Sequence, residues 1–451
     1  MFKKIIIAIL VVALVLSFAG CSKTSYEYGP VAGGANASDA VVGNGNYVVQ
    51  KGNFIYYINS IESISGKNTL GLTNAGGIVR ANLDGTGATM VYPKLVANDS
   101  KAGLYIFGDR IYFTSPCDSV NSSGSVQSNL LDIMSVKLDG SNAKKHITLG
   151  SNKLEMTFME DGGVVYLVYV QDGIVYKLNT SVEKAKKEVF LEDFTSKLFA
   201  GNSIVYTKTA LLDKEEKVED RYSEVFSITP NGKETKLFDG NSTTKVKYKI
   251  EVVDVVDGKL YYVKKDDVLS LENATYCRSF SNGQASNDEK KVSTTPIAKD
   301  GVLTYNFNGK NGVIISASGI GTVYFGNDGE IKRISSSALS MSFVKDKYLY
   351  FTNVSETAGK VNRYDVDKIL TTTEKVTSEQ VFGYKKSVEK DGETKEETVY
   401  DTFYAFNFLD VVSYGDNVFF YSGAKTERKM TVWNMTSDTM TVISVADKVV
   451  E

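Results

Sequence analysis

The 451-residue chain has only one histidine, one tryptophan, three cysteines and five prolines. A single imidazole, His146, excludes any site that needs two histidines, and so few thiols disfavour zinc centres built from cysteine and histidine. Lysine and arginine (51) nearly balance aspartate and glutamate (54), so no basic face for nucleic acid is indicated. The composition predicts no metal site, no cofactor and no nucleic-acid partner.

Tyrosine, phenylalanine and glycine are abundant, with 27, 22 and 38 copies. Aromatic and β-branched residues favour strands, and glycine favours the tight turns between them. No amphipathic pattern long enough for a three-turn helix is present. The chain is therefore predicted to be all-β.

The first 20 residues are ordered like an export signal. Lys3 and Lys4 precede an apolar run from Ile5 to Leu16, and small residues lead from there to Cys21. The apolar run is too short for an ordinary membrane-spanning helix, and its flanks are those of a signal peptide. We expect residues 1–20 to be removed and the remainder to be exported.

The segment Ala19-Gly20-Cys21 resembles the lipobox of bacterial lipoproteins, although Phe18 stands where that family usually has leucine. The resemblance implies that the Cys21 thiol receives a diacylglyceryl group and that Cys21 becomes the new N-terminus. Two acyl chains such as palmitate hold a protein firmly at a bilayer. The expected location is the extracytoplasmic face of the cell membrane. The alternative is a secretory signal with an incidental cysteine.

Residues 21–46 are rich in glycine, serine, alanine and asparagine, a composition typical of a flexible tether. Residues 47–451 then form the folded part. Its two cysteines, Cys117 and Cys277, lie in different repeat units. We expect two free thiols there, with a disulfide as the alternative.

A repeated pattern runs through the folded part: a turn with glycine, aspartate or asparagine, then alternating β-branched and aromatic residues. A further strand and a hairpin turn usually follow, as in Ile78–Gly85 and Ile133–Gly140, where Asp-Gly supplies the positive φ of a tight turn. Another strand usually precedes the pattern. The eight copies start at Gly52, Gly108, Gly162, Gly201, Asp257, Gly319, Lys345 and Gly415.

Repeats of four antiparallel strands predict a single β-propeller of four-stranded blades. Eight blades are the first choice and seven the alternative. The ambiguity comes from the unit at about Ile297–Ser340, because its copy of the pattern lies unusually close to the next one.

Tyr112-Phe113-Thr114-Ser115 and Tyr350-Phe351-Thr352-Asn353 resemble degenerate Tyr-Trp-Thr-Asp repeats of low-density-lipoprotein-receptor propellers. The longer repeat is similar to that of a domain-of-unknown-function family of exported bacterial lipoproteins with such a propeller. Phenylalanine replaces tryptophan, and serine or asparagine replaces aspartate, so the inter-blade contacts of that aspartate are not expected here. The resemblance implies a surface scaffold, commonly one that binds a partner.

Function in propellers resides on the connections and at the channel mouth. Two of the long interruptions of the repeat hold charge-dense stretches of mixed sign, Lys214–Arg221 and Lys385–Glu397, which we interpret as solvated hairpin extensions. The interruptions are Ser60–Ala75, Cys117–Asn129, Thr209–Arg221, Asn273–Lys291 and Thr371–Thr402.

A hydrolase or lyase acting on carbohydrate would need carboxylates at the channel mouth. Asp109, Asp257 and Asp416 occupy equivalent turns of different repeats, which turn chemistry alone explains. We therefore predict no catalytic residue, and expect His146 and Trp433 to be ordinary strand residues. The carboxylate candidates near strand ends are Asp254, Asp257, Asp266, Asp267, Asp410 and Asp416. The recurrent tyrosines expected in the core are Tyr57, Tyr112, Tyr166, Tyr206, Tyr262, Tyr324 and Tyr350.

Together these features predict a lipid-anchored, extracytoplasmic β-propeller that is a binding or scaffolding module for a protein or cell-envelope polymer. The alternative is the carbohydrate-active hydrolase or lyase.

Overall fold

The computed structural model describes residues 28–31, 40–59, 76–94, 96, 103–117, 129–150, 154–211, 221–241, 247–266, 272–299, 301–352, 361–381, 383–400, 411–422 and 429–445. The expected signal peptide, Cys21, Asp267 and Asp410 lie outside these residues. The regular secondary structure of the described part is almost entirely strand, with one short helix, α2 (Val366–Thr371). The all-β prediction is confirmed.

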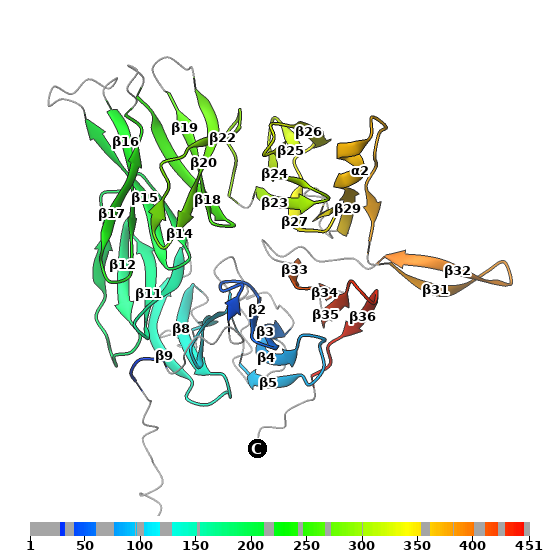
Figure 1. Ribbon diagram of the computed structural model, residues 1–451. Coiled ribbons are helices and arrows are strands. Elements are labelled where there is room, and N and C mark those ends of the chain that lie inside the picture. Colours follow the sequence, from blue (N-terminus) through cyan, green and yellow to red (C-terminus); the bar gives the residue numbers. More distant parts are fainter. Residues whose placement is uncertain are drawn as a thin grey trace, which may run out of the picture.

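Eight antiparallel blades form a ring (Figure 1), which confirms the propeller and decides between eight and seven blades. Blade 1 contains β2 (Val48–Lys51), β3 (Phe54–Asn59), β4 (Gly77–Asn82) and β5 (Thr89–Tyr92). Blade 2 contains β6 (Tyr105–Phe107), β7 (Arg110–Pro116), β8 (Leu130–Lys137) and β9 (Lys144–Gly150). Blades 3 and 4 contain β10 (Met156–Asp161), β11 (Val164–Gln171), β12 (Ile174–Asn179) and β13 (Glu188–Leu191), then β14 (Ser196–Ala200), β15 (Ser203–Leu211), β16 (Arg221–Ile228) and β17 (Glu234–Asp239).

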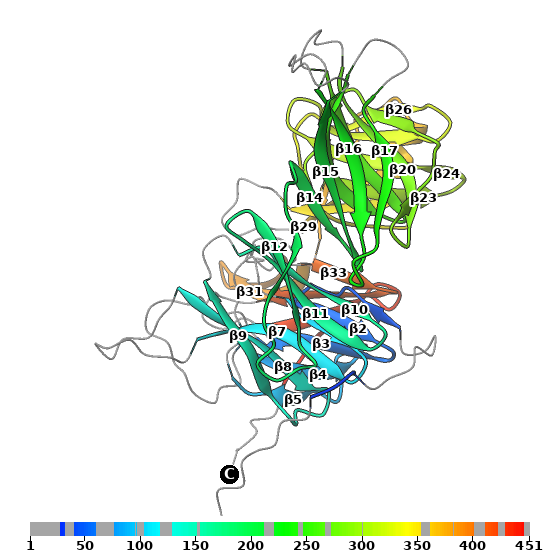
Figure 2. The ribbon, with the colours of Figure 1, turned by 90° about the vertical axis from the view of Figure 1, so that its left-hand side faces the viewer.

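The second half of the ring repeats this order, and Figure 2 shows blade 4 against blade 5. Blades 5 and 6 contain β18 (Lys249–Val256), β19 (Lys259–Lys265), β20 (Asn273–Ser281) and β22 (Lys290–Ser293), then β23 (Val302–Phe307), β24 (Lys310–Ala317), β25 (Gly321–Gly326) and β26 (Ile331–Ser335). Blades 7 and 8 contain β27 (Ser340–Lys345), β28 (Tyr348–Thr352), β29 (Val361–Asp365) and β30 (Glu379–Gln380), then β33 (Val411–Tyr414), β34 (Asn417–Ser422), β35 (Lys429–Asn434) and β36 (Thr439–Val442).

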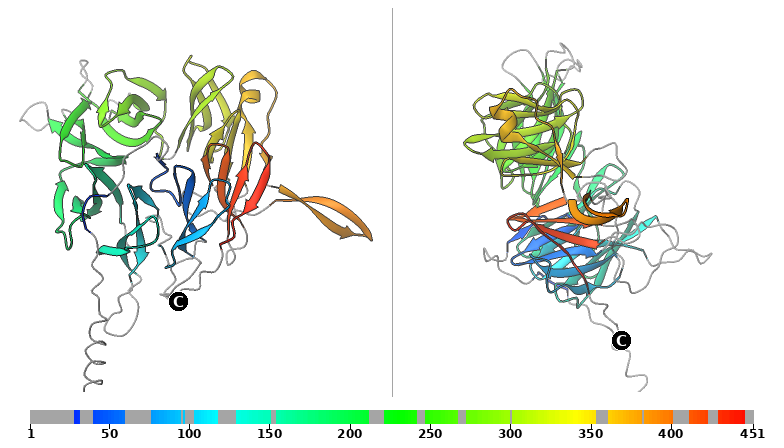
Figure 3. Two further views of the ribbon diagram at one scale, coloured as in Figure 1. Left: turned by 60° about the horizontal axis from the view of Figure 1, so that its bottom comes forward. Right: turned by 90° about the vertical axis from the view of Figure 1, so that its right-hand side faces the viewer.

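Three short elements lie outside this scheme. Strand β1 (Val41–Val42) pairs with β2, and β21 (Gln284–Ala285) pairs with the end of β20. The hairpin of β31 (Gly383–Lys390) and β32 (Glu393–Tyr400) pairs only with itself and projects from the ring (Figure 3). Because of β1, part of the stretch that the sequence assigned to a tether belongs to the first sheet.

Blade 6 differs in detail from the sequence prediction. The pattern at Gly319–Phe325 begins the third strand, β25, and not the second. The second strand, β24, follows the turn Asn308-Gly309, whose φ angles are 50° and 78°. Since β24 contains no aromatic residue, it lacks the signature by which the other second strands are recognised. This shift explains why that copy of the pattern lies so close to the next.

The core consists of apolar clusters between neighbouring blades. Tyr206 packs with Met159 between blades 3 and 4, and Tyr350 packs with Trp433 between blades 7 and 8. One cluster joins blade 8 to blades 1 and 2, and so closes the ring. Of the seven recurrent tyrosines, all except the half-buried Tyr166 are buried. Packing between blades therefore accounts for these recurrent tyrosines, as predicted.

Candidate functional site

The two ends of the blades differ in their connections when the ring is taken as a whole. In every blade a two-residue turn joins the first strand to the second, and glycine at positive φ allows it, as at Gly52 and Gly415. The third-to-fourth connections lie at the same end because the strands alternate in direction. The second-to-third connections and those between blades lie at the other end.

Contacts between blades align these ends around the ring. The backbone N–H of Glu160, beside the first turn of blade 3, donates to Oδ1 of Asn202 in the first turn of blade 4 at 2.7 Å. Lys345 of blade 7 pairs with Asp416 in the first turn of blade 8 at 2.8 Å. The ring therefore has two distinct surfaces. We call the side with the two-residue turns the turn face and the opposite side the loop face.

The loop face carries most of the interruptions seen in the sequence. Ser60–Ala75, Cys117–Asn129 and Thr209–Arg221 are second-to-third connections, and most of their residues lie outside the described part. Thr371–Thr402 includes the hairpin β31–β32, which leads from blade 7 to blade 8 on this face. The two longest connections of the ring, residues 60–76 and 381–410, are thus on the same face.

One interruption was assigned wrongly. Asn273–Lys291 is not a long loop, because it contains the third strand of blade 5 and the start of the fourth. Its polar residues are held by contacts that the alternation of the sequence does not reveal. Thr275, for example, is fully buried and donates a hydrogen bond to the carbonyl of Thr295 at 2.7 Å.

The hairpin extension predicted at Lys385–Glu397 is confirmed. Strands β31 and β32 pair over their whole length, and the backbone register places Lys386 opposite Glu397 and Lys390 opposite Glu393. Among the described strands, the hairpin pairs only with itself, and it extends outward from the loop face (Figure 3).

The repeated carboxylates lie on the turn face. Asp257 occupies the first turn of blade 5 with a φ of 47°, and Asp416 accepts hydrogen bonds from Lys345 and Thr436 at 2.8 Å each. The Lys345 and Thr436 contacts hold the pKa of Asp416 below its ordinary value. Asp109 occupies the corresponding turn of blade 2. All three have the turn role that their repetition indicated.

The remaining described carboxylate candidates do not form a pair. Asp254 lies on the first strand of blade 5, where its Oδ1 accepts from the N–H of Val255 at 2.8 Å. Asp266 follows the second strand and is 3% exposed. Within the described ranges, no group of three or more histidine, cysteine, aspartate or glutamate residues could hold a metal ion.

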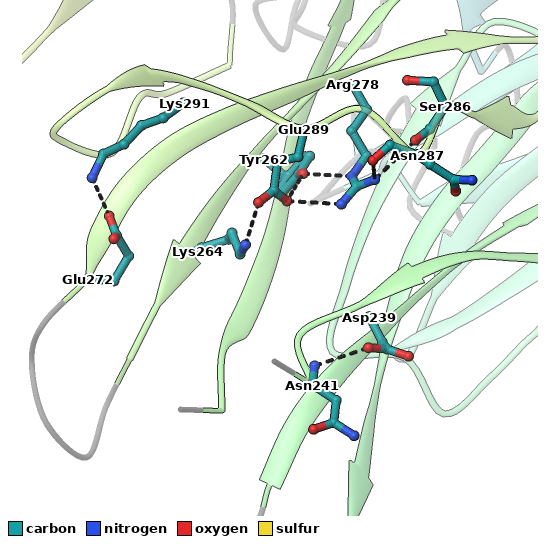
Figure 4. A network of polar contacts seen from close by, with 10 residues as sticks. All are labelled: Asp239, Asn241, Tyr262, Lys264, Glu272, Arg278, Ser286, Asn287, Glu289 and Lys291. Atoms are coloured by element: carbon teal, nitrogen blue, oxygen red, sulfur yellow. Dashed lines mark hydrogen bonds and ion pairs between the residues drawn. The ribbon is translucent and has the colours of Figure 1, made fainter. Parts of the chain in front are cut away.

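A network of charged side chains joins the strands of blade 5 (Figure 4). Glu289 accepts from the hydroxyl of Tyr262 at 2.5 Å and pairs with Lys264 at 2.6 Å and Arg278 at 3.1 Å. Burial raises the pKa of Glu289, but the hydrogen bonds from Lys264 and Tyr262 outweigh it, so that its pKa lies below the ordinary value. Arg278 also lies 4.4 Å from the ring centre of Phe238 in blade 4.

Blade 4 carries a copy of this arrangement. Tyr206 donates to Glu234, Lys208 lies 3.5 Å from the same carboxylate, and Phe226 stacks on Tyr206 at 5.7 Å between ring centres. The arrangement thus recurs in neighbouring blades, and Glu234 and Glu289 are each engaged by a tyrosine and a lysine within it.

The single histidine lies in a buried cluster of blade 2. Its Nε2 is 2.8 Å from Oγ of Ser135, and its ring stacks on Tyr112. Ser135 is fully buried and accepts from Arg110 at 3.1 Å, so it is inaccessible to a substrate. Burial, together with the positive charges of Lys144 and Arg110, lowers the pKa of His146 to about 3. The imidazole is therefore a neutral structural group, as the sequence indicated.

Two further predictions concern single residues. Trp433 lies on the third strand of blade 8, is 7% exposed and donates to Asp438 at 2.9 Å, so it belongs to the core. Cys117 and Cys277 are buried free thiols, which confirms their assignment as unpaired.

The described part of the chain contains no helix long and apolar enough to cross a membrane. No family model matches the sequence, and no curated protein matches it.

Three solved structures illustrate the likeness in fold, and the first is a β-propeller domain. The β-propeller domain of the Trilobed protease from Pyrococcus furiosus is 13% identical, with a TM-score of 0.36, and the match covers 89% of this chain and 98% of that one. A eukaryotic initiation factor is 11% identical, with a TM-score of 0.41 and coverage of 92% and 90%. TolB from Acinetobacter baumannii is 13% identical, with a TM-score of 0.28 and coverage of 70% and 78%. These likenesses concern the fold alone.

Proposed function

We propose that the protein is a lipid-anchored, extracytoplasmic β-propeller that binds a protein or cell-envelope polymer through its loop face. The observation that carries this proposal is the difference between the faces. Two-residue turns join the first and second strands on one face, whereas the longest connections and the projecting hairpin extend from the other. Binding residues are commonly found on loops that a rigid scaffold positions.

The composition of these connections suits recognition of a polar partner. Residues 60–75 and 117–129 are rich in serine, asparagine and glycine, which supply adaptable hydrogen bonds at binding surfaces. The hairpin β31–β32 adds charges of both signs. A partner with hydroxyl, amide and mixed charged groups, such as a protein surface or a polysaccharide, fits this chemistry better than an apolar ligand.

The lipid anchor is supported by the sequence of residues 1–21, in which a short apolar run with a basic start leads to Cys21. The resemblance of the repeats to receptor-like propellers of exported lipoproteins agrees with it. Diacylation of Cys21 would keep the propeller at the outer surface of the cell membrane.

Binding of the lipid-free protein to purified cell envelopes tests the proposal. In a Cys21→Ser background, one variant replaces residues 384–399 with a Gly-Ser-Gly linker and a second shortens residues 119–128. The matched control carries Lys233→Ala and Asp288→Ala, two exposed positions in third-to-fourth connections on the turn face. We expect co-sedimentation of the protein with the envelopes to fall for the two loop-face variants and to persist for the control. Circular dichroism should show that all three variants are folded. Equal binding of all variants would contradict the proposal.

A further inference from the structure

The N-terminal segment Tyr28–Val31 lies against blades 2 and 3, before the first strand begins. The N–H of Val31 donates to the carbonyl of Gly163 at 2.8 Å. Its side chain packs on the apolar cluster between these blades. The ammonium of Lys144 lies 4.2 Å from the ring centre of Tyr28. A Cβ on Gly163 would come within 3.2 Å of Pro30, so this glycine allows the close approach.

All these contacts are on the turn face. Gly163 belongs to the first turn of blade 3, and Lys144 begins the fourth strand of blade 2 directly after its hairpin turn. The next described part of the chain is on the same face, because the carbonyl of Ala40 accepts from the N–H of Gly52 in the first turn of blade 1 at 3.3 Å. The segment before β1 is thus held to the turn face at two places.

Only seven positions separate Cys21 from Tyr28. A fully extended chain spans about 3.3–3.6 Å per residue, so the distance from Cys21 to the docked segment is at most about 25 Å. A lipid on Cys21 therefore holds the turn face of blades 2 and 3 close to the bilayer.

We propose that Tyr28–Val31 is a strap that fixes the orientation of the propeller on the membrane. The turn face at blades 2 and 3 lies toward the lipid headgroups, and the loop face points away from them. This inference rests on the proposed lipid anchor at Cys21 and adds the surface that meets the bilayer.

The surface beside the strap suits contact with headgroups. The third-to-fourth connection of blade 3 carries Lys184 and Lys186 against the single acidic residue Glu183, and these three side chains are exposed. The neighbouring Lys187 donates to Gln171 at 2.9 Å. Val182, in the same connection, is 51% exposed. Lysines beside an exposed apolar residue favour the interface of a membrane with anionic lipids.

Energy transfer from the protein to a lipid-bound acceptor tests the orientation. Blade 3 offers a matched pair of exposed label sites, Asp161→Cys on the turn face and Asp172→Cys on the loop face. The strand β11 between them has eight residues and spans about 25 Å. The native Cys117 and Cys277 are buried, and protein without an added cysteine measures their background labelling. The lipidated protein is reconstituted in vesicles of phosphatidylglycerol and phosphatidylethanolamine.

We expect stronger transfer from position 161 than from position 172. Two variants should abolish this difference: Tyr28→Ser with Val31→Ser, which removes the docking contacts, and an insertion of about 20 Gly-Ser residues after Ser25, which lengthens the link while leaving the contacts in place. If the protein with the native strap showed equal energy transfer from positions 161 and 172, or stronger transfer from position 172, the proposed orientation would be wrong.

Flotation of the same samples with vesicles separates the two proposals. Protein that floats but shows no difference between the labels contradicts the strap alone. Protein that does not float contradicts the lipid anchor itself.

Discussion

The hydroxyl of Tyr421, in the last blade, donates a hydrogen bond of 2.6 Å to the backbone carbonyl of Ile58 in the first blade. Tyr414 makes a similar bond of 2.5 Å to the carbonyl of Val48. Within the described residues, the strands of each blade come from one stretch of the chain, and no strand is shared between the first and last blades. Side chains, and not a common sheet, close the ring.

Tyr421→Phe should lower the free energy of unfolding by about 1–3 kcal/mol, because a buried carbonyl loses its partner. Tyr166→Phe is the matched control, since Tyr166 also lies on a second strand but is only half-buried. Equilibrium denaturation with urea measures both. Equal losses in the two variants would show that the bond to Ile58 does not contribute to closure.

Deletion of the last blade, from about Phe403, should abolish cooperative unfolding. The truncation exposes the apolar surfaces of blade 7 at Phe343 and Tyr350 and of blade 1 at Tyr47 and Val48, which blade 8 covers in the intact ring. Calorimetry and far-ultraviolet circular dichroism, which reports backbone structure, follow the transition. A truncated chain that still melts in one sharp step would indicate that the ring is not a single cooperative unit.

His146 should make the protein less stable in acid. Its pKa is lowered to about 3 in the folded state by burial and by Lys144 and Arg110, against about 6.5 when unfolded. The unfolded chain therefore binds the proton first, and the stability from the neutral imidazole is complete above about pH 6.5 and lost as the pH falls toward 3.

Between pH 7 and pH 5 this residue accounts for up to about 2 kcal/mol. His146→Gln keeps a polar group beside Ser135 but does not titrate, so its stability should change less over that interval. Urea denaturation at both pH values gives the comparison. An identical loss in the parent protein and the variant would contradict the assignment.

Cys21→Ser should release the protein from the membrane to the soluble fraction, because serine has no thiol to receive the diacylglyceryl group as a thioether, and no acyl chains then hold the protein. Fractionation of cells with immunodetection measures the distribution. Ala19→Val, two positions earlier, leaves the thiol in place and serves as a comparison for expression and export. Retention of the serine variant in the membrane would remove the lipid anchor from the account.

The sequence predicted those parts of the fold that depend on local chemistry. Turns such as Gly52-Asn53 and strands such as β3 repeat with little change, because each blade must pack its apolar faces against two neighbouring blades in the same way. Prediction failed where a blade varies. β24 has no aromatic residue, and β20 carries the polar residues Thr275 and Arg278, whose hydrogen-bond partners lie outside that strand.

Contacts between distant parts of the chain could not be predicted in the same way. The bond of Tyr421 to Ile58 joins residues 363 positions apart, and nothing local distinguishes Tyr421 from other strand tyrosines. Tyr28–Val31 lies in a stretch of glycine, serine and alanine whose composition indicates a tether. Its docking depends on contacts with Gly163 and Lys144, which belong to two different blades that only folding brings together. The two faces of the ring likewise could be distinguished only once the bounds and order of the strands were known, because these decide at which end each connection lies.

Photo-crosslinking in intact cells tests most directly whether the loop face is the binding surface. A photoreactive amino acid is placed at Asp172 on the loop face, or at Asp161 at the opposite end of the same blade, and at Thr394 in the hairpin β31–β32. We predict discrete adducts with one envelope component from positions 172 or 394 and none of that component from position 161. Adducts with that component from position 161 alone, or no adducts from either loop-face position, would contradict the account.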